Sequence, residues 1–175
     1  MKVDVIKLGF LEENCYFLTK ENKTLIIDPG EDIDKILKFI SYNNFNVIGI
    51  LITHFHFDHI GALKELKEKY NVKVVSIKNK EVIKPFEYEI IETKGHTDDS
   101  VSYYFKKEGI IFTGDFLFKE SIGRYDFDNS SEIDMYESLK KIKKLKEDLK
   151  IYPGHGEETT LFYELKHNEF LRDLW

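Results

Sequence analysis

The chain has 175 residues, of which 42% are hydrophobic and 14% aromatic, so it can bury a core of ordinary size without cross-links. Its single cysteine, Cys15, excludes an internal disulfide framework and fits a reducing compartment, so we expect a cytoplasmic location. With 26 basic and 32 acidic residues, the formal net charge of −6 argues against nucleic acid as the substrate.

The sequence predicts neither a targeting segment nor a membrane span. The N-terminal stretch 1–8 is too short and too interrupted by charge to be a signal peptide. No apolar run approaches the roughly 20 residues that a membrane-spanning helix needs. We therefore expect no membrane partner.

The hydrophobic pattern predicts strands and helices that alternate along the chain. In the first half, strands are expected at 3–8, 15–19, 24–28, 47–52 and 72–76, and helices at 32–42 and 60–70. In the second half, strands are expected at 88–93, 101–105, 110–113 and 150–152, and helices at 131–146 and 164–174.

These elements predict an α/β fold, an αβ/βα sandwich in which helices cover the outer faces of the sheets. We see no linker or second domain, so a single domain is expected over residues 1–175. The lysine-rich stretch 140–150 is interpreted as an amphipathic surface helix because its apolar residues share one helical face. These residues are Leu139, Ile142, Leu145 and Leu149.

One short segment concentrates metal-binding side chains. From Thr53 to His59 the chain reads Thr-His-Phe-His-Phe-Asp-His, directly after the apolar run 47–52. Imidazole is the commonest protein ligand for transition metals, and a carboxylate is a competent partner. The segment therefore predicts a metal site at the end of a strand.

The spacing of these donors indicates two ions. In an extended chain, side chains at i and i+2 point to the same side, so His54 and His56 can bind one ion. Asp58 and His59 lie one step further, near the start of a helical pattern, and point elsewhere. Gly61 follows them and permits a close backbone approach.

Further donors follow later strands, each beside a glycine. His96 follows Gly95, Asp115 follows Gly114, and His155 lies between Gly154 and Gly156. Each of them alone is typical of a turn or cap residue. Together they indicate a site, because five of the six histidines now lie where strands run into loops, and α/β proteins collect their sites there. The sixth histidine, His167, lies in a late helical stretch and is interpreted as a surface residue.

The order of these motifs resembles the metallo-β-lactamase superfamily, specifically its dinuclear hydrolases of the glyoxalase II (hydroxyacylglutathione hydrolase) type. The resemblance runs from Leu8 to about Thr160 and implies the αβ/βα sandwich of two mixed sheets that this family has. It also implies two divalent transition-metal ions, with zinc expected and iron or manganese as alternatives. By position, His54, His56 and His96 would hold the first ion; Asp58, His59 and His155 the second; and Asp115 would bridge both.

The resemblance implies a thioester hydrolase. Two ions that share a water lower its pKa toward about 7 and supply hydroxide, and a leaving thiolate with a pKa near about 8.5 needs little protonation. Asp58 is mainly a ligand that can also orient the hydroxide or carry a proton. Arg124 stands where a substrate carboxylate could bind, although the aromatic residue expected two positions later is Asp126. The chain ends at Trp175, as in shorter bacterial members without the C-terminal helical region.

Other functions stay open. A persulfide dioxygenase of this superfamily would use one iron ion and consume oxygen, and a lactone or phosphodiester hydrolase would keep both ions. A β-lactamase is less favoured, because those enzymes usually lack the histidine that is present here as His59. A metal-binding module without enzymatic activity is the alternative from another class. Such a module could lose the second ion without penalty, so the seven filled ligand positions argue against this alternative.

Overall fold

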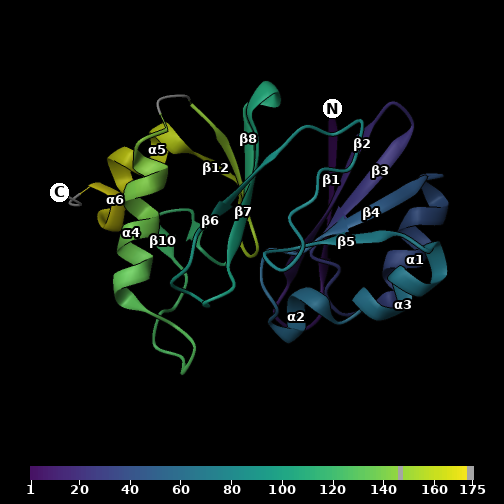
Figure 1. Ribbon diagram of the computed structural model, residues 1–175, viewed down its shortest axis with the longest axis horizontal. Coiled ribbons are helices and arrows are strands. Elements are labelled where there is room, and N and C mark those ends of the chain that lie inside the picture. Colours follow the sequence, from purple (N-terminus) through teal and green to yellow (C-terminus); the bar gives the residue numbers. More distant parts are fainter. Residues whose placement is uncertain (146–147, 173–175) are drawn as a thin grey trace. The chain divides into compact units, whose positions relative to one another are not determined.

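The computed structural model describes residues 1–145 and 148–172. By its internal contacts the chain divides into two compact units, Met1–Glu87 and Tyr88–Trp175. Each unit contains a five-stranded mixed sheet with its own helices (Figure 1). No helix in the described ranges combines the length and apolar character that a bilayer crossing requires.

The sheet of the first unit has the order β1-β2-β3-β4-β5. β1, β2 and β3 pair antiparallel, whereas β3, β4 and β5 run parallel to one another. The carboxyl ends of β3, β4 and β5 therefore meet at one edge of this sheet. The strands are β1 (Lys2–Leu8), β2 (Glu13–Lys20), β3 (Lys23–Ile27), β4 (Val47–Leu51) and β5 (Lys73–Val75).

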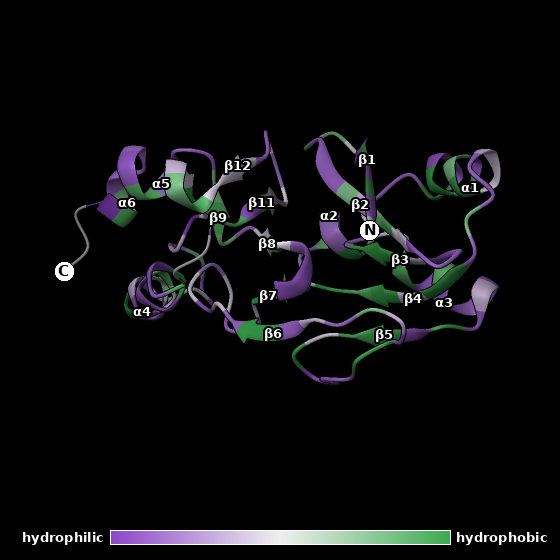
Figure 2. Cartoon of the chain, turned by 90° about the horizontal axis from the view of Figure 1, so that it is seen from above, coloured by the Kyte–Doolittle hydropathy of each residue, from purple (hydrophilic) through white to green (hydrophobic). Residues whose placement is uncertain are grey.

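The helices of the first unit are α1 (Ile33–Tyr42), α2 (Phe57–Ile60) and α3 (Leu63–Tyr70). α1 buries Ile36 and Ile40, which are four positions apart and so share one helical face, and α3 buries Leu66. These side chains pack with Phe17 and Ile50 of the sheet in one apolar core. In Figure 2 the central strands are hydrophobic, whereas α1 carries both colours, as expected of an amphipathic helix.

The sheet of the second unit has the order β12-β11-β8-β7-β6. β7 is antiparallel to both of its neighbours, and β11 is parallel to β8, so β6, β8 and β11 run in the same direction. Their carboxyl ends therefore meet at one edge. The strands are β6 (Glu89–Glu92), β7 (Val101–Phe105), β8 (Ile110–Gly114), β11 (Lys150–Pro153) and β12 (Thr159–Thr160), and β9 (Leu117–Phe118) with β10 (Ser121–Ile122) forms a small separate hairpin.

The helices of the second unit are α4 (Glu132–Lys143), α5 (Leu161–His167) and α6 (Glu169–Arg172), and a 3₁₀ turn spans Lys106–Glu108. Ser131 caps α4 by accepting a hydrogen bond from Asp134 N at 3.1 Å. Met135, Leu139 and Leu171 of these helices pack with strand residues in the apolar core of this unit. Figure 1 shows α4, α5 and α6 on the same side of the sheet.

Three helix predictions need correction. The predicted helix 60–70 is two helices, because Ala62 N donates to Pro29 O at 3.1 Å and to Gly30 O at 2.6 Å and so starts a new segment. Gly61 has the close approach expected of it, since a Cβ there would lie 3.0 Å from Gly30 O. The predicted helix 164–174 is likewise two helices, which begin at Leu161 and meet at Asn168, and its last two residues lie outside the described ranges.

The helix predicted over 140–150 is wrong at both 144–145 and 148–150, and its residues 146–147 lie outside the described ranges. α4 ends at Lys143, and Lys150 begins β11, which pairs in parallel with β8. Leu149 is buried, but it enters the core from the segment before β11 and not from a helix. A strand pairing formed elsewhere in the unit overrides the local helical pattern. The strands β9, β10 and β12 were not predicted, since two-residue strands leave no periodic signal.

Candidate metal centre

The predicted metal-binding segment lies where β4 ends. Thr53 and His54 lie just after the strand, separated from its last residue by Ile52, and Asp58 and His59 lie inside the four-residue helix α2. All four predicted donors of this unit gather at the carboxyl edge of the parallel strands. The rings of His54 and His59 have centroids 4.2 Å apart, and Asp58 Oδ2 lies 3.8 Å from His59 Nε2.

His54 and His56 converge as their i, i+2 spacing predicted. His54 Nε2 lies 3.2 Å from His56 Nδ1. Two imidazole nitrogens bound to one tetrahedral ion at 2.0–2.1 Å would be about 3.3 Å apart. The observed separation therefore fits a pair of ligands that close on the same ion.

Hydrogen bonds from Thr53 orient His54. The Thr53 hydroxyl donates to Asp28 Oδ2 at 2.6 Å, so its oxygen accepts from His54 Nδ1, which lies 3.1 Å away. This places the proton of the imidazole on Nδ1. The opposite nitrogen, Nε2, is then the one that can bind an ion, and it is the one that points toward His56.

Asp28 orients His59 in the same way. Its Oδ2 atom lies 3.0 Å from His59 Nδ1, and its Oδ1 atom accepts from Thr53 N at 2.7 Å. The carboxylate therefore holds His59 Nδ1 in its protonated form and turns Nε2 toward Asp58. One buried side chain thus fixes two predicted metal ligands, His59 directly and His54 through Thr53.

Glu13 is a second buried acid beside His59. It begins β2, its side chain is 0% exposed, and its Oε1 atom lies 4.0 Å from His59 Nδ1. Gly30 makes this packing possible, because a Cβ there would lie 2.5 Å from Glu13 Oε2 and 2.2 Å from Asp58 O. The sequence predicted no role for Glu13 or Asp28. The available signal was an acidic residue beside a predicted strand, Glu13 just before 15–19 and Asp28 at the end of 24–28.

In the second unit, His96, Asp115 and His155 lie together. They follow β6, β8 and β11, whose shared direction brings the three loops to one edge. Asp115 Oδ2 lies 3.6 Å from His96 Nε2 and 3.5 Å from His155 Nε2. The Asp115 oxygen is thus nearly equidistant from the two imidazole nitrogens.

The segment after β10 holds His96 in place. His96 Nδ1 donates to Arg124 O at 2.8 Å, which leaves Nε2 facing Asp115. Ser130 Oγ donates to His96 O at 2.6 Å. Gly123 is required beside it, since a Cβ there would lie 1.7 Å from Asp115 O. The main chain around Arg124 therefore positions a predicted ligand, a role that we had not anticipated.

The Arg124 side chain pairs with Asp126 on its own loop. Nε lies 2.9 Å from Asp126 Oδ1, and Nη2 lies 3.1 Å from Oδ2. The guanidinium also lies over the Phe127 ring, 4.5 Å from its centroid. Hydrogen bonding to Asp126 raises the pKa of Arg124 and lowers that of Asp126, so both groups are charged at neutral pH.

The donor types suit a transition metal, since imidazole and carboxylate ligands are those that zinc, iron and manganese take in proteins. The structure gathers the seven predicted ligands into two groups, four in the first unit and three in the second. That the two groups share two ions stays a prediction.

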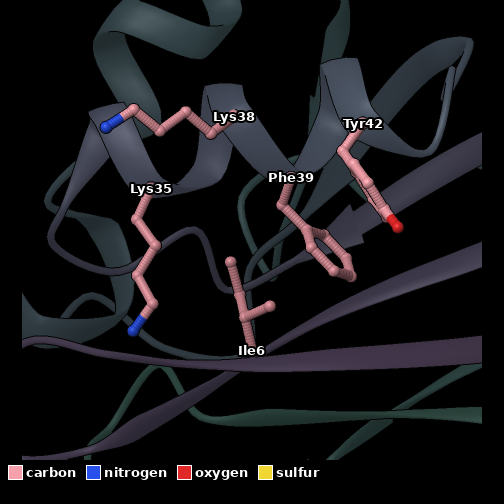
Figure 3. A pocket seen from close by; sticks show the side chains of 5 residues that line it. All are labelled: Ile6, Lys35, Lys38, Phe39 and Tyr42. Carbon is pink, nitrogen blue, oxygen red and sulfur yellow. The ribbon is translucent and has the colours of Figure 1, made fainter.

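A surface pocket elsewhere in the first unit is of a different kind. It lies between α1 and β1 and is lined by Ile6, Lys35, Lys38, Phe39 and Tyr42 (Figure 3). Lys35 Nζ donates to Lys7 O at 2.6 Å. Because none of the five lining residues is a histidine, cysteine or carboxylate, this pocket is not a metal site.

Two mixed sheets with histidine and aspartate donors at their strand ends define a metal-binding α/β protein. The sequence pattern of the metallo-beta-lactamase superfamily matches residues 8–89 and 80–155. The chain therefore belongs to the metallo-β-lactamase superfamily. This finding confirms the family predicted from the motifs.

Relatives in bacteria match nearly the whole chain. The probable metallo-hydrolase YqgX of Bacillus subtilis is 33% identical over 98% of this chain and 98% of its own length. The hydroxyacylglutathione hydrolase GloC of Haemophilus influenzae is 27% identical, also over 98% of both chains.

Solved structures confirm the predicted fold class. The B3 metallo-β-lactamase BLEG-1 superposes with a TM-score of 0.91, at 29% identity over 97% of this chain and 99% of that one. The protein TTHA1623, solved in a di-iron-bound form, superposes with a TM-score of 0.86, at 29% identity over 96% of this chain and all of its own. The protein has the metallo-β-lactamase fold.

Proposed function

We propose that this protein is a dinuclear metal-dependent hydrolase, a thioesterase of the hydroxyacylglutathione hydrolase type. The observation that carries the proposal is the position of Asp115 Oδ2, which lies 3.6 and 3.5 Å from the Nε2 atoms of His96 and His155. A carboxylate so placed suits a centre that needs one ligand for two ions. The similarity to GloC supports the thioester as the substrate class.

Our ligand assignment gives each ion donors from both groups. Zinc is the proposed metal, and the di-iron form of TTHA1623 supports iron as the alternative, with manganese also possible. His54, His56 and His96 would hold the first ion; Asp58, His59 and His155 the second; and Asp115 would contribute to both.

When bound, the two ions would activate a water and polarise the carbonyl of the substrate. The protein's own residues would bind the substrate and transfer protons. Asp115 and Asp58 are the proposed catalytic residues, and the Asp58 carboxylate can hold a proton that the attacking water gives up. No acid is needed for the departing thiol, because a thiolate with a pKa near about 8.5 leaves without protonation. Arg124 is the proposed contact for a substrate carboxylate.

The proposed substrate is a small molecule. A net charge of −6 disfavours nucleic acid as a partner. We propose a cytoplasmic location and no membrane partner. The sequence predicts no particular oligomeric state.

Metal analysis combined with a substrate screen tests the proposal. The full chain, purified without added metal, is assayed for metal content and then tested on S-lactoylglutathione, lactones and phosphodiesters. Hydrolysis of the thioester supports the proposal. Turnover of a lactone or phosphodiester alone would overturn the substrate class, and one iron per chain with oxygen uptake on a glutathione persulfide would indicate a persulfide dioxygenase. Ions bound without turnover of any substrate would indicate a binding module.

A further inference from the structure

The Arg124–Asp126 ion pair lies beside a metal-donor group of the second unit. Arg124 O accepts the Nδ1 hydrogen bond of His96, and the guanidinium of the same residue lies over Phe127. The Phe127 ring in turn meets the His96 ring edge to face, with centroids 5.6 Å apart. A short chain of contacts therefore places this charged pair next to a proposed metal ligand.

The pair is bidentate within the loop. Both Asp126 oxygens are engaged, one by Nε and one by Nη2 of Arg124. A substrate carboxylate that used the same edge of the guanidinium would have to displace Asp126. If it used another edge, it would still meet the negative charge of Asp126 two residues away. Either way, Asp126 opposes the binding of an anion to Arg124.

The two side chains are exposed, at 67% and 66%. Solvent screens such a pair, so we expect Asp126 to reduce anion affinity by a moderate factor and not to abolish it. Among the described residues, the side chain of Asp126 pairs with Arg124 and not with a proposed metal ligand, so its replacement should leave the ligands in place.

We propose that Asp126 is a specificity-determining residue: by pairing with Arg124 beside the metal site, it weakens the binding of carboxylate-bearing substrates relative to neutral ones. This inference rests on the proposed thioesterase function. It concerns the substrate class of that function, because Asp126 lowers the advantage that Arg124 gives to thioesters whose thiol part carries a carboxylate.

A pair of thioesters with the same acyl group tests it. S-lactoylglutathione has carboxylates on its thiol part, whereas S-lactoyl-N-acetylcysteamine is neutral. In the metal-loaded full chain, Asp126→Ala should lower KM for the first thioester about 3- to 10-fold and change KM for the second less than about 2-fold. The kcat should change little with either, because the bond that breaks is the same.

Two further variants identify the cause. In the double variant Arg124→Ala/Asp126→Ala the gain should disappear, since Asp126 acts through Arg124. Glu137→Gln is the matched control, because it removes one negative charge from another exposed ion pair of the second unit, Glu137 with Lys140 at 2.9 Å. It should move neither KM. An equal shift in both KM values, no shift, or a gain that persists in the double variant would overturn the inference.

Binding without turnover separates this inference from the proposed function. S-methylglutathione cannot be hydrolysed as a thioester, and its Kd can be measured by calorimetry on the same metal-loaded proteins. Asp126→Ala should bind it about 3- to 10-fold more tightly than the unchanged protein. If no thioester is turned over but this tightening is seen, the proposed function fails and the role of Asp126 stands. Equal Kd values, or no binding by either protein, would overturn the role of Asp126.

Discussion

Asp28 accepts two hydrogen bonds from Thr53, one from the main-chain N–H at 2.7 Å and one from the hydroxyl at 2.6 Å. Because the hydroxyl proton is committed to Asp28, the Thr53 oxygen accepts from His54 Nδ1. Asp28 also lies 3.0 Å from His59 Nδ1. The ring orientation of two proposed ligands therefore depends on one carboxylate.

The first prediction concerns this carboxylate. Asp28→Asn removes the charge that holds the two imidazoles, and supporting partners of metal-bound histidines typically contribute 10- to 100-fold to affinity. We expect a loss of about that size for both ions, measured by competition with a chromophoric chelator. Asp34→Asn, an exposed acid in the first turn of α1, is the control and should bind metal normally. Unchanged affinity in Asp28→Asn would contradict the positioning role.

The variant Thr53→Val should distinguish the contribution of His54 to metal binding from that of His59. The substitution keeps the size of the side chain but removes the oxygen that accepts from His54 Nδ1, whereas Asp28 stays beside His59. We expect the affinity for one ion to fall by about 10-fold and the other to stay nearly unchanged. Stepwise metal titration measures this difference. Equal losses at both steps would mean that Thr53 acts on the whole segment.

The metal stoichiometry is the third prediction. Seven donors exceed the needs of one four-coordinate ion and suit two ions that share Asp115. A metal-loaded crystal structure should show two ions about 3.5 Å apart. A fully loaded protein with one ion, and with Asp58 and His59 away from it, would contradict the assignment and favour the persulfide dioxygenase.

The fourth prediction distinguishes ligands within the second unit. Asp115→Ala should release both ions together, whereas His155→Ala should weaken mainly one. Activity should collapse in both variants. Metal titration of the two proteins tests the bridging role, and an equal, partial loss in each would show that Asp115 does not bridge.

Gly123 offers a stability test. A Cβ at this position would lie 1.7 Å from Asp115 O, so Gly123→Ala must displace the backbone next to a proposed ligand. We expect a loss in the free energy of unfolding of about 3 kcal/mol. Gly109→Ala is the control, since nothing lies within 4 Å of its Cβ and the cost is limited to about 1 kcal/mol from its positive φ of 66°. Denaturant unfolding of both variants measures the difference, and equal losses would contradict the steric argument.

Much of the candidate site could be predicted from the sequence alone. Ligand identity depends on side-chain chemistry and on position relative to strand ends, and both can be read locally. The i, i+2 spacing predicted that His54 and His56 would converge, and their nitrogens lie 3.2 Å apart. The glycines beside His96, Asp115 and His155 marked the loops that gather at one sheet edge. Motif order also sufficed for the family and the fold class, which the comparisons confirm.

Tertiary structure decided what depends on partners distant in the sequence. Asp28 supports His59, 31 positions away, through a side-chain contact that no local pattern encodes. The helix predicted over 140–150 stops at Lys143, because strand pairing with β8 outweighs local helical propensity at Lys150. Asp126 appeared in the sequence as a departure from the family pattern. Its bidentate contact with Arg124 emerges only from the folded loop, because side-chain direction in a turn follows from the backbone path and not from spacing.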